Sequence, residues 1–574
     1  MKHLILTASI IGCTTVVASA SIISVPGDQR TISQAIGAAN PNDTILIEDG
    51  TYREQIDFGG VDLVVASRFL LDRDRDHITS TIIDGDHNGT VINCVSDETS
   101  GTKLIGLSIR NGTGRIWIYE DRTFFHGGGA IFIKNASPTF LDCNIYGNTV
   151  EEEGSLGGGV YCSGSSSVFE RCWIKANTAG EGGGIYAEGG DIELRNCRFT
   201  SNHSNWDHGG GAQLISGGHL IETCYFDSNT TTTGDGAGAF VSGGSLVRNS
   251  VFVANHSYDG GGLYCGNAVI ENCVFAENSV DRWGGAIFGI GGPTSITDCL
   301  FLRNHSAWDG GALALEYSDP LIRRCLFIDN TADRNGGALY SWDEANPLFY
   351  NSAAIGNHAA SAGFAYCSDA SSPLVNSSII IENTMPSFVF DPEDAPGLVS
   401  VAFCDFEGGR DAIQTNGNGY IDWGRGNIDL DPRFVAEPDS DYQLSENSPC
   451  IDSGDPNFPN DPDSTRTDMG AYYHDQANRV TEGDPIPSVH GLLALYPNPF
   501  NSLTEVSFVV NTSKHVTLKV YSLLGEELET IVESELPAGN YSYRLNGSNL
   551  STGIYLVRLN IGGREETAGA VLLR

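Results

Sequence analysis

The chain has 574 residues, of which 70 are glycine, and 72 acidic residues against 32 lysine and arginine residues give it a net charge of −40. A surface with that charge repels phosphate backbones, which excludes nucleic acid as a partner. Charged residues are only 18% of the chain and hydrophobic residues 40%, which excludes a simple disordered polymer. The glycines lack the three-residue period of collagen, so their excess predicts tight turns instead.

The first twenty residues are typical of an export signal. An apolar stretch over residues 4–17 is followed by Ala18-Ser19-Ala20, a small-x-small cleavage site, which makes Ser21 the predicted first residue after cleavage at Ala20. The apolar stretch is too short for a membrane span and no later segment is long enough, so no transmembrane span is expected. An alternative is a lipoprotein signal, in which Cys13 would be lipidated.

A unit of about 26 residues repeats through the middle of the chain. Each unit pairs a cysteine, or a serine in three cases, with an asparagine five residues later, as in Cys143-Asn-Ile-Tyr-Gly-Asn148. Many units begin with a glycine-rich segment such as Gly284-Gly285-Ala286-Ile287-Phe288. The repeated asparagines are Asn148, Asn177, Asn202, Asn229, Asn255, Asn278, Asn304, Asn330, Asn357 and Asn383.

A fixed period of this length indicates a stacked array in which each unit buries its apolar face against its neighbours. Runs such as residues 268–275 alternate in the manner of strands, and no unit has room for a normal helix. We therefore predict an all-β solenoid, a parallel β-helix with three short strands in each coil. Stacked asparagines should form a hydrogen-bonded ladder, and the cysteines should be mostly free thiols, because in-register side chains point the same way.

The repeats resemble known families. The Gly-Gly-Ala-Ile segments and the Phe-x-x-Asn pairs, such as Phe275 to Asn278, resemble the repeats of chlamydial polymorphic outer-membrane proteins and of right-handed β-helices in the pectin-lyase-like superfamily. The opening residues 23–52 and the closing residues 429–471 also resemble such proteins. Residues 31–39 read as a short amphipathic helix that covers the open N-terminal end of the solenoid. The resemblance implies a right-handed β-helix but no particular function.

The C-terminal residues read as a small Ig-like β-sandwich, with alternating strands at 504–510, 516–521, 541–545 and 554–559. Tyr496-Pro-Asn-Pro-Phe500 and the later turn motifs resemble the type A C-terminal sorting domain of the type IX secretion system; an ordinary Ig-like binding module is the alternative. The predicted organisation is a signal peptide at 1–20, a β-helix with its capping helix at 21–474, a linker at 475–495 and a sorting sandwich at 496–574.

Alternate repeats carry a histidine followed by an aromatic and an acidic residue. Equivalent residues two coils apart would lie ~10 Å apart along one edge. Rings can stack on sugar faces and carboxylates can accept hydrogen bonds from hydroxyls, so this edge is a candidate glycan site. Solvated loops and a metal site of histidine and aspartate are the alternatives. The candidate residues are His203, Trp206, Asp207, His256, Tyr258, Asp259, Trp283, His305, Trp308 and Asp309.

An insertion at residues 112–126 interrupts the period and contains Trp117 and Tyr119, which are further binding candidates unless the segment only packs against the rod. Catalysis receives little support from the sequence. Lysines are scarce in the solenoid, and we expect no ladder of carboxylates at matching positions, although lyases and hydrolases of this fold need such groups. No cofactor is predicted, and calcium stays open as a ligand of the acidic runs at 72–76 and 455–468.

These observations favour a non-catalytic adhesin, glycan-binding protein or structural rod that is carried by the type IX secretion machinery. The resemblance implies Sec export through the periplasm to the outer-membrane surface or the extracellular space. Extracellular polysaccharide or a host or cell surface is the expected partner. The alternative is a polysaccharide lyase or glycoside hydrolase of the pectin-lyase-like fold.

Overall fold

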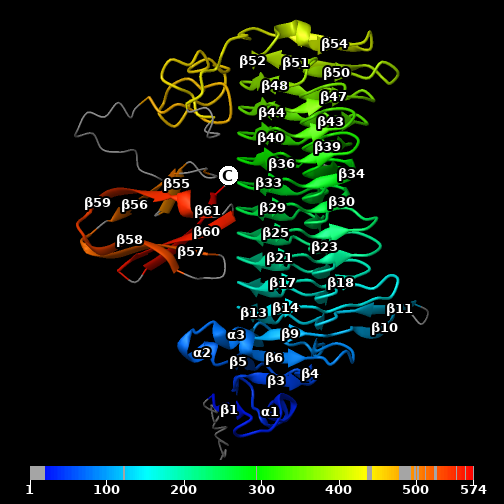
Figure 1. Ribbon diagram of the computed structural model, residues 1–574, viewed down its shortest axis with the longest axis vertical. Helices are drawn as coiled ribbons and strands as arrows, with labels where there is room; N and C mark the ends of the chain where they lie inside the picture. Colours follow the sequence, from blue (N-terminus) through cyan, green and yellow to red (C-terminus); the bar gives the residue numbers. More distant parts are fainter. Residues whose placement is uncertain are drawn as a thin grey trace, which may run out of the picture.

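The computed structural model is a long parallel β-solenoid with a small antiparallel domain after it (Figure 1). It describes residues 20–119, 123–291, 294–435, 442–476, 493–496, 500, 503–510, 512–522, 527–550, 553–562 and 564–572. The predicted signal lies outside these residues up to position 19, so its cleavage between Ala20 and Ser21 stays a prediction. Among the described residues, no helix has the length and apolar character needed to cross a membrane.

Four parallel sheets run along the solenoid, and a coil that contributes to all four passes through them in the order A, B, C and D. Sheet A has 16 strands, from β1 (Ile22–Val25) to β54 (Gly419–Trp423). Sheets B and D have 14 strands each, the first from β3 (Gly50–Arg53) to β52 (Asp405–Phe406) and the second from β4 (Ile56–Asp57) to β53 (Ile413–Gln414).

Sheet C differs from the prediction of three strands per coil. It adds a fourth strand to eight central coils, from β18 (Thr178–Ala179) to β46 (His358–Ala359). Most of its strands have only two residues, because the chain bends again at a glycine pair soon afterwards. A representative coil contains β32 (Val269–Glu271), β33 (Val274–Ala276), β34 (Ser279–Trp283) and β35 (Ile287–Ile290).

The predicted asparagine ladder is confirmed, and it is continuous from Asn148 to Asn383. Each side-chain amide donates to the side-chain oxygen of the asparagine in the next coil, at 2.9–3.1 Å. The same oxygen also accepts the backbone N–H of the preceding asparagine, as between Asn278 and Asn304 at 3.1 Å. These asparagines are buried, so the ladder satisfies polar groups that would otherwise be costly inside the solenoid.

Cysteines and phenylalanines form further interior columns. All thirteen described cysteines, from Cys94 to Cys450, are buried free thiols, as predicted. Phe199, Phe226 and Phe252 begin a stack of nearly parallel rings with centroids 4.5 and 4.8 Å apart. Burial in this apolar interior raises the pKa of the Cys162 and Cys265 thiols. The interior columns therefore have a structural role.

The glycine excess originates largely at the corner between sheets C and D. Gly284 has a φ of +68°, and an added Cβ would lie 2.3 Å from the carbonyl oxygen of Ile287. At the next residue, Gly285, a Cβ would lie 2.2 Å from the carbonyl oxygen of Gly311 in the following coil. Glycine at these two positions therefore allows the coils to stack closely at the corner.

Both ends of the solenoid are covered. Helix α1 (Ile32–Ala38) confirms the predicted capping helix and buries Ile32, Ala35 and Ile36. Two short helices, α2 (Phe69–Asp72) and α3 (Asp76–Ser80), lie beside the early coils. After the last coil, which contains the short helix η1 (Gly409–Ala412), residues 442–476 fold back as a closing segment against the apolar outer face of sheet B (Figure 1).

The C-terminal domain contains a three-stranded and a four-stranded antiparallel sheet that share one apolar core, as the predicted sandwich requires. Its first strand begins in the predicted linker and ends at Tyr496, and the strands at 527–536 and 564–572 were not predicted. The strands are β55 (Leu493–Tyr496), β56 (Leu503–Val510), β57 (Lys514–Ser522), β58 (Glu527–Leu536), β59 (Gly539–Asn546), β60 (Gly553–Ile561) and β61 (Arg564–Leu572), with η2 (Gly547–Asn549) before β60.

Candidate functional site

One residue precedes the glycine-rich turn of each central coil, where sheet C turns into sheet D. Backbone hydrogen bonds connect these positions between coils, for example from the N–H of Gly236 to the carbonyl of Asp259 at 2.9 Å. Equivalent residues of adjacent coils lie ~4.8 Å apart, which brings acidic, imidazole and aromatic side chains together. We call this set the corner column, and it consists of Glu181, His208, Asp235, Asp259, Trp283, Asp309 and Asn335.

The corner column corrects the expectation that no carboxylates occupy matching positions. Glu181, His208 and Asp235 were missed because the repeat was aligned on the asparagine, and the distance from the asparagine to the corner varies. The signal was the residue before each glycine-rich turn, as in Asp235-Gly236-Ala237. The same variation places Asp207 one residue before the column, whereas Asp259 and Asp309 lie within it.

His208 connects two carboxyl groups with different acidities. The backbone N–H of Asp235 donates to His208 Nδ1 at 3.1 Å, so Nε2 carries the hydrogen that faces Asp207 Oδ1 at 2.9 Å. The hydrogen bond from His208 lowers the pKa of Asp207. Burial, reinforced by the negative charge of Asp259, raises the pKa of Asp235 to about 6. Burial also raises the pKa of Glu181. The corner thus holds carboxyl groups that lose their protons at different pH values because their environments differ.

Asp259 and Asp309 are buried, so they do not present their carboxylates to solvent. Asp259 accepts hydrogen bonds from Arg282 Nε at 3.1 Å and from the backbone N–H of Trp283 at 2.9 Å. Asp309 accepts the backbone N–H of Asn335 at 3.1 Å, and burial raises its pKa. Both residues hold the corner in place and fix the side chains beside it.

Aromatic and guanidinium groups alternate at the position before the corner column. Four successive coils contribute Tyr258, Arg282, Trp308 and Arg334, which we call the edge ladder. The guanidinium carbon of Arg282 lies 4.5 Å from the ring centroid of Tyr258, and that of Arg334 lies 4.3 Å from the Trp308 ring. Because Asp259 also holds Arg282, the ladder is a rigid surface of flat groups.

Further aromatic rings line the outer face of sheet D beside the edge ladder. Phe240 on β27 (Ala239–Val241) stacks on Tyr264 of β31 (Leu263–Cys265) with ring centroids 4.6 Å apart. Trp283 lies 5.1 Å from Trp342 and 6.1 Å from Trp308, centroid to centroid. The corner therefore combines polar groups with a continuous aromatic face.

The predicted histidines lie in one column of sheet C, two coils apart as expected. His203 Nδ1 contacts Thr230 Oγ1 at 2.7 Å, and His256 and His305 make equivalent contacts with the hydroxyls of Ser279 and Thr331 at 2.9 and 3.0 Å. These hydrogen bonds connect each histidine to the next coil. Beside this column, the Trp206 side chain is 56% exposed and accessible to a ligand.

The insertion at 112–126 contains an antiparallel hairpin, with Trp117 and Tyr119 in β10 (Arg115–Tyr119) paired to β11 (Thr123–Gly127). The side chains of Trp117 and Tyr119 lie outside the described part of the structure, so their predicted binding role stays a prediction. Within the described residues, no three histidine, cysteine or acidic side chains form a group that could hold a metal ion.

Comparison with known families identifies both parts of the chain. Residues 70–230 and 210–333 match the family described as right handed beta helix region, and residues 494–572 match the secretion system C-terminal sorting domain. A curated relative, metabotropic glutamate receptor-like protein R of Dictyostelium discoideum, is 26% identical over 144 residues. That match covers 24% of this chain and 8% of the relative, so it spans a small part of both proteins.

The sorting-domain match and the antiparallel sandwich agree, as do the β-helix match and the parallel coils. A domain of this kind directs its cargo to the cell surface or the extracellular space. The chain is therefore a secreted or surface β-helix protein with a C-terminal sorting domain of the type IX secretion system.

Proposed function

We propose that this protein is a surface or secreted rod that binds extracellular polysaccharide along the edge ladder. The alternation of Tyr258, Arg282, Trp308 and Arg334 on successive coils carries the proposal. Such a rod would serve as an adhesin or a binding spacer at the cell surface.

The geometry of the edge ladder suits a chain of sugar rings. A polymer lying along the solenoid would meet one flat side chain per coil, and the guanidinium groups would donate hydrogen bonds to its hydroxyls. The rings need little ordering when the ligand arrives, because Asp259 and the sheet D aromatics already hold them. The net charge of −40 favours a neutral polysaccharide over a polyanion.

The test compares Trp308→Ala and Trp206→Ala with the full chain in binding to a panel of neutral and acidic polysaccharides. We expect each variant to weaken binding about tenfold, equivalent to about 1.4 kcal/mol, through loss of a stacking ring. Tyr420→Ala is the matched control, because Tyr420 is 68% exposed but lies on the last strand of sheet A, away from the corner. Unchanged binding by both tryptophan variants would contradict the proposal.

The same corner supports glycoside hydrolysis as a second candidate function. Asp235 holds its proton up to about pH 6, whereas the His208 hydrogen bond keeps Asp207 ionised to lower pH. A carboxylic acid beside a carboxylate is the pair that protonates a glycosidic oxygen and activates water or attacks the sugar. Arg282 would assist by binding sugar hydroxyls beside this pair.

Hydrolysis predicts the release of reducing sugars from a polysaccharide that the protein binds. Asp235→Asn should abolish this release while binding persists, because the amide keeps the shape of the acid but donates no proton. Arg303→Gln, on a different corner of the coil, should leave release unchanged. The absence of reducing ends from every bound polymer would eliminate this candidate without affecting the binding proposal.

Delivery to the surface is expected to depend on the C-terminal domain. Deletion of residues 496–574 should leave the protein in the periplasm, as measured by fractionation and by antibody labelling of intact cells. Deletion of the hairpin at 115–127 is the control and should not change delivery. Normal surface delivery without the C-terminal domain would refute this export route.

A further inference from the structure

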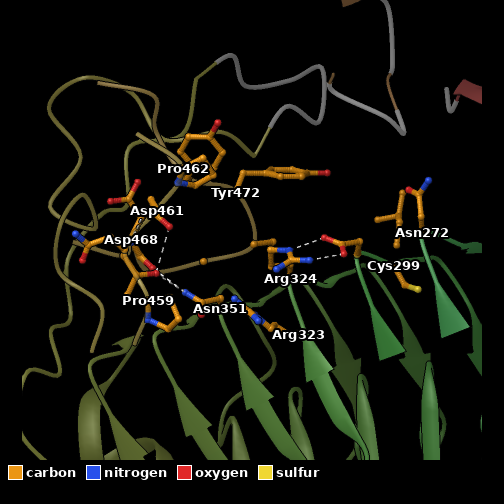
Figure 2. Close-up of a pocket in the computed structure, with 17 residues that line it drawn as sticks. Asn272, Cys299, Arg323, Arg324, Asn351, Pro459, Asp461, Pro462, Asp468 and Tyr472 are labelled. Carbon is orange, nitrogen blue, oxygen red and sulfur yellow. Dashed lines mark hydrogen bonds and ion pairs between the residues drawn. The ribbon is translucent and has the colours of Figure 1, made fainter. Parts of the chain in front are cut away.

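A cavity of about 570 Å³ lies at the opposite turn of the coils, between the closing segment and the turns that connect sheets A and B (Figure 2). The turn residues of four successive coils form one wall. Prolines, tyrosines and polar residues between positions 459 and 473 form the other. The turn residues in the first wall are Asn272, Asp298, Arg324 and Asn351.

Most polar groups of this cavity already have partners. Arg324 binds the Asp298 carboxylate through Nε and Nη2, at 2.6 and 2.5 Å. Asn351 Nδ2 donates to Thr467 Oγ1 at 3.1 Å and to the carbonyl of Asp468 at 3.0 Å, which anchors the closing segment. The walls are thus held in place, and the cavity does not depend on a ligand to form.

Arg323, the last residue of β40 (Leu321–Arg323), differs from its neighbours. Within the described part of the chain, its guanidinium has no hydrogen-bond or ion-pair partner, although Asp298 and Asp461 are near. Other arginines of these turns have carboxylate partners, as in the pairs of Arg171 with Asp142 and Arg324 with Asp298. Burial and the positive charge of Arg324 lower the pKa of Arg323, so its charge is poorly compensated in the free protein.

We propose that this cavity binds a small ring-bearing carboxylate through Arg323. A guanidinium matches a carboxylate with two parallel hydrogen bonds, which an arginine without a partner can provide. Tyr472 and Tyr473 offer flat faces for a ring, and the cavity volume suits a molecule of one or two rings. Asp298 and Asp461 lie near enough to repel a second negative charge, so a monoanion fits better than a phosphate dianion.

The experiment is calorimetric titration of the full chain with D-glucuronate, benzoate, D-glucose and inorganic phosphate. Binding of glucuronate but not benzoate identifies a sugar acid, and binding of benzoate alone identifies an aromatic acid. Either result supports the proposal if Arg323→Gln weakens binding at least tenfold and Arg323→Lys weakens it less. Arg303→Gln is the matched control, because Arg303 pairs with Glu277 outside the cavity.

Three outcomes would overturn the proposal: binding that Arg323→Gln leaves intact, equal binding of glucose and glucuronate, or tighter binding of phosphate than of either carboxylate. Circular dichroism of each variant separates loss of the site from loss of the fold. Trp308→Ala should bind the carboxylate normally, so this test does not depend on polysaccharide binding at the edge ladder.

Discussion

The asparagine ladder and the corner column both repeat once per coil, but they differ in what they repeat. The ladder has the same side chain at ten successive positions and is sealed from solvent. The corner column changes identity at nearly every coil, from Glu181 through His208 and Asp235 to Trp283. Uniformity inside the solenoid follows from one hydrogen-bond geometry, whereas variation at the corner places different chemical groups side by side on a rigid frame.

The largest loss of stability should follow from interrupting the asparagine ladder. Asn278→Ala removes the acceptor of the Asn255 amide and the donor to the carbonyl of Phe252, which leaves buried polar groups without partners. We expect the free energy of unfolding to fall by about 4 kcal/mol, since each orphaned group costs ~1–3 kcal/mol. Denaturant titration followed by circular dichroism measures this loss.

Asn88→Ala is the matched control, because Asn88 is an exposed asparagine outside the ladder. This control should change the unfolding free energy by less than ~0.5 kcal/mol. A similar small effect for Asn278→Ala would show that the ladder contributes no more than an ordinary surface residue.

The next largest effect should come from the support beneath the edge ladder. Asp259→Ala leaves the Arg282 guanidinium and the Trp283 N–H without their acceptor. Breaking a buried pair in this way costs about 3 kcal/mol. It should also weaken polysaccharide binding, because Arg282 then loses its fixed position against Tyr258.

Asp281→Ala provides the control for the Asp259 variant. Its side chain lies one residue before Arg282 but is 61% exposed, and it only approaches His256. It should leave both stability and binding nearly unchanged. An Asp259 variant that behaved like the Asp281 variant would show that the corner is not preorganised by its buried acid.

The titration of Asp235 also distinguishes the corner column from the asparagine ladder, because asparagine has no ionisable group. The pKa of Asp235 is about 6, above its ordinary value of 3.8, so the folded protein binds this proton more tightly than the unfolded chain does. The resulting stabilisation is complete below pH 3.8 and is lost as the pH rises through about 6. As the pH rises from 4 to 7.5, the free energy of unfolding of Asp235→Asn should therefore increase by roughly 2 kcal/mol relative to that of the natural protein.

Parallel unfolding titrations at pH 4 and pH 7.5 measure this change. Asp281→Asn serves as the control and should show no such dependence, because the Asp281 side chain is 61% exposed. A constant difference between Asp235→Asn and the natural protein across this pH range would place Asp235 in a more solvated environment than the structure gives it.

The sequence was sufficient to predict the features that show a regular pattern along the chain. The asparagines from Asn148 to Asn383 and the free cysteines were predicted because the same residue types recur from coil to coil. The capping helix was predicted at 31–39 from its amphipathic pattern, and the structure has it at Ile32–Ala38. The two-residue strands of sheet C were not predicted, because two residues contain no alternation to detect. Strand β58 (Glu527–Leu536) was missed for a related reason: most of its side chains are exposed, and of its residues Ile531, Val532 and Leu536 pack against the core.

The candidate site was predicted only in part. The histidine motif and the repeat between its copies identified Tyr258, Trp283 and Trp308, which lie at this corner although they follow their asparagines by three, five and four residues. They missed Asp235 and Arg282, because stacking between coils rather than any local motif brings them together. The cavity at Arg323 depends on a closing segment more than 130 residues away in sequence, and no spacing rule connects the two.

The smallest predicted effect concerns the buried cysteine column. Substitutions there test whether the position needs a side chain of this size or one that forms a hydrogen bond. Cys273→Ser should cost less than ~1 kcal/mol, because Ser250 occupies the equivalent position one coil earlier and donates to the carbonyl of Arg248 at 2.8 Å. The Cys273 thiol faces the corresponding carbonyl of Glu271 at 3.3 Å, so a hydroxyl would find the same acceptor. Cys273→Val, which fits the space but cannot donate, separates the hydrogen bond from packing. If Cys273→Ser unfolded the solenoid while Cys273→Val did not, the column would require an apolar side chain, and the natural serines would need another explanation.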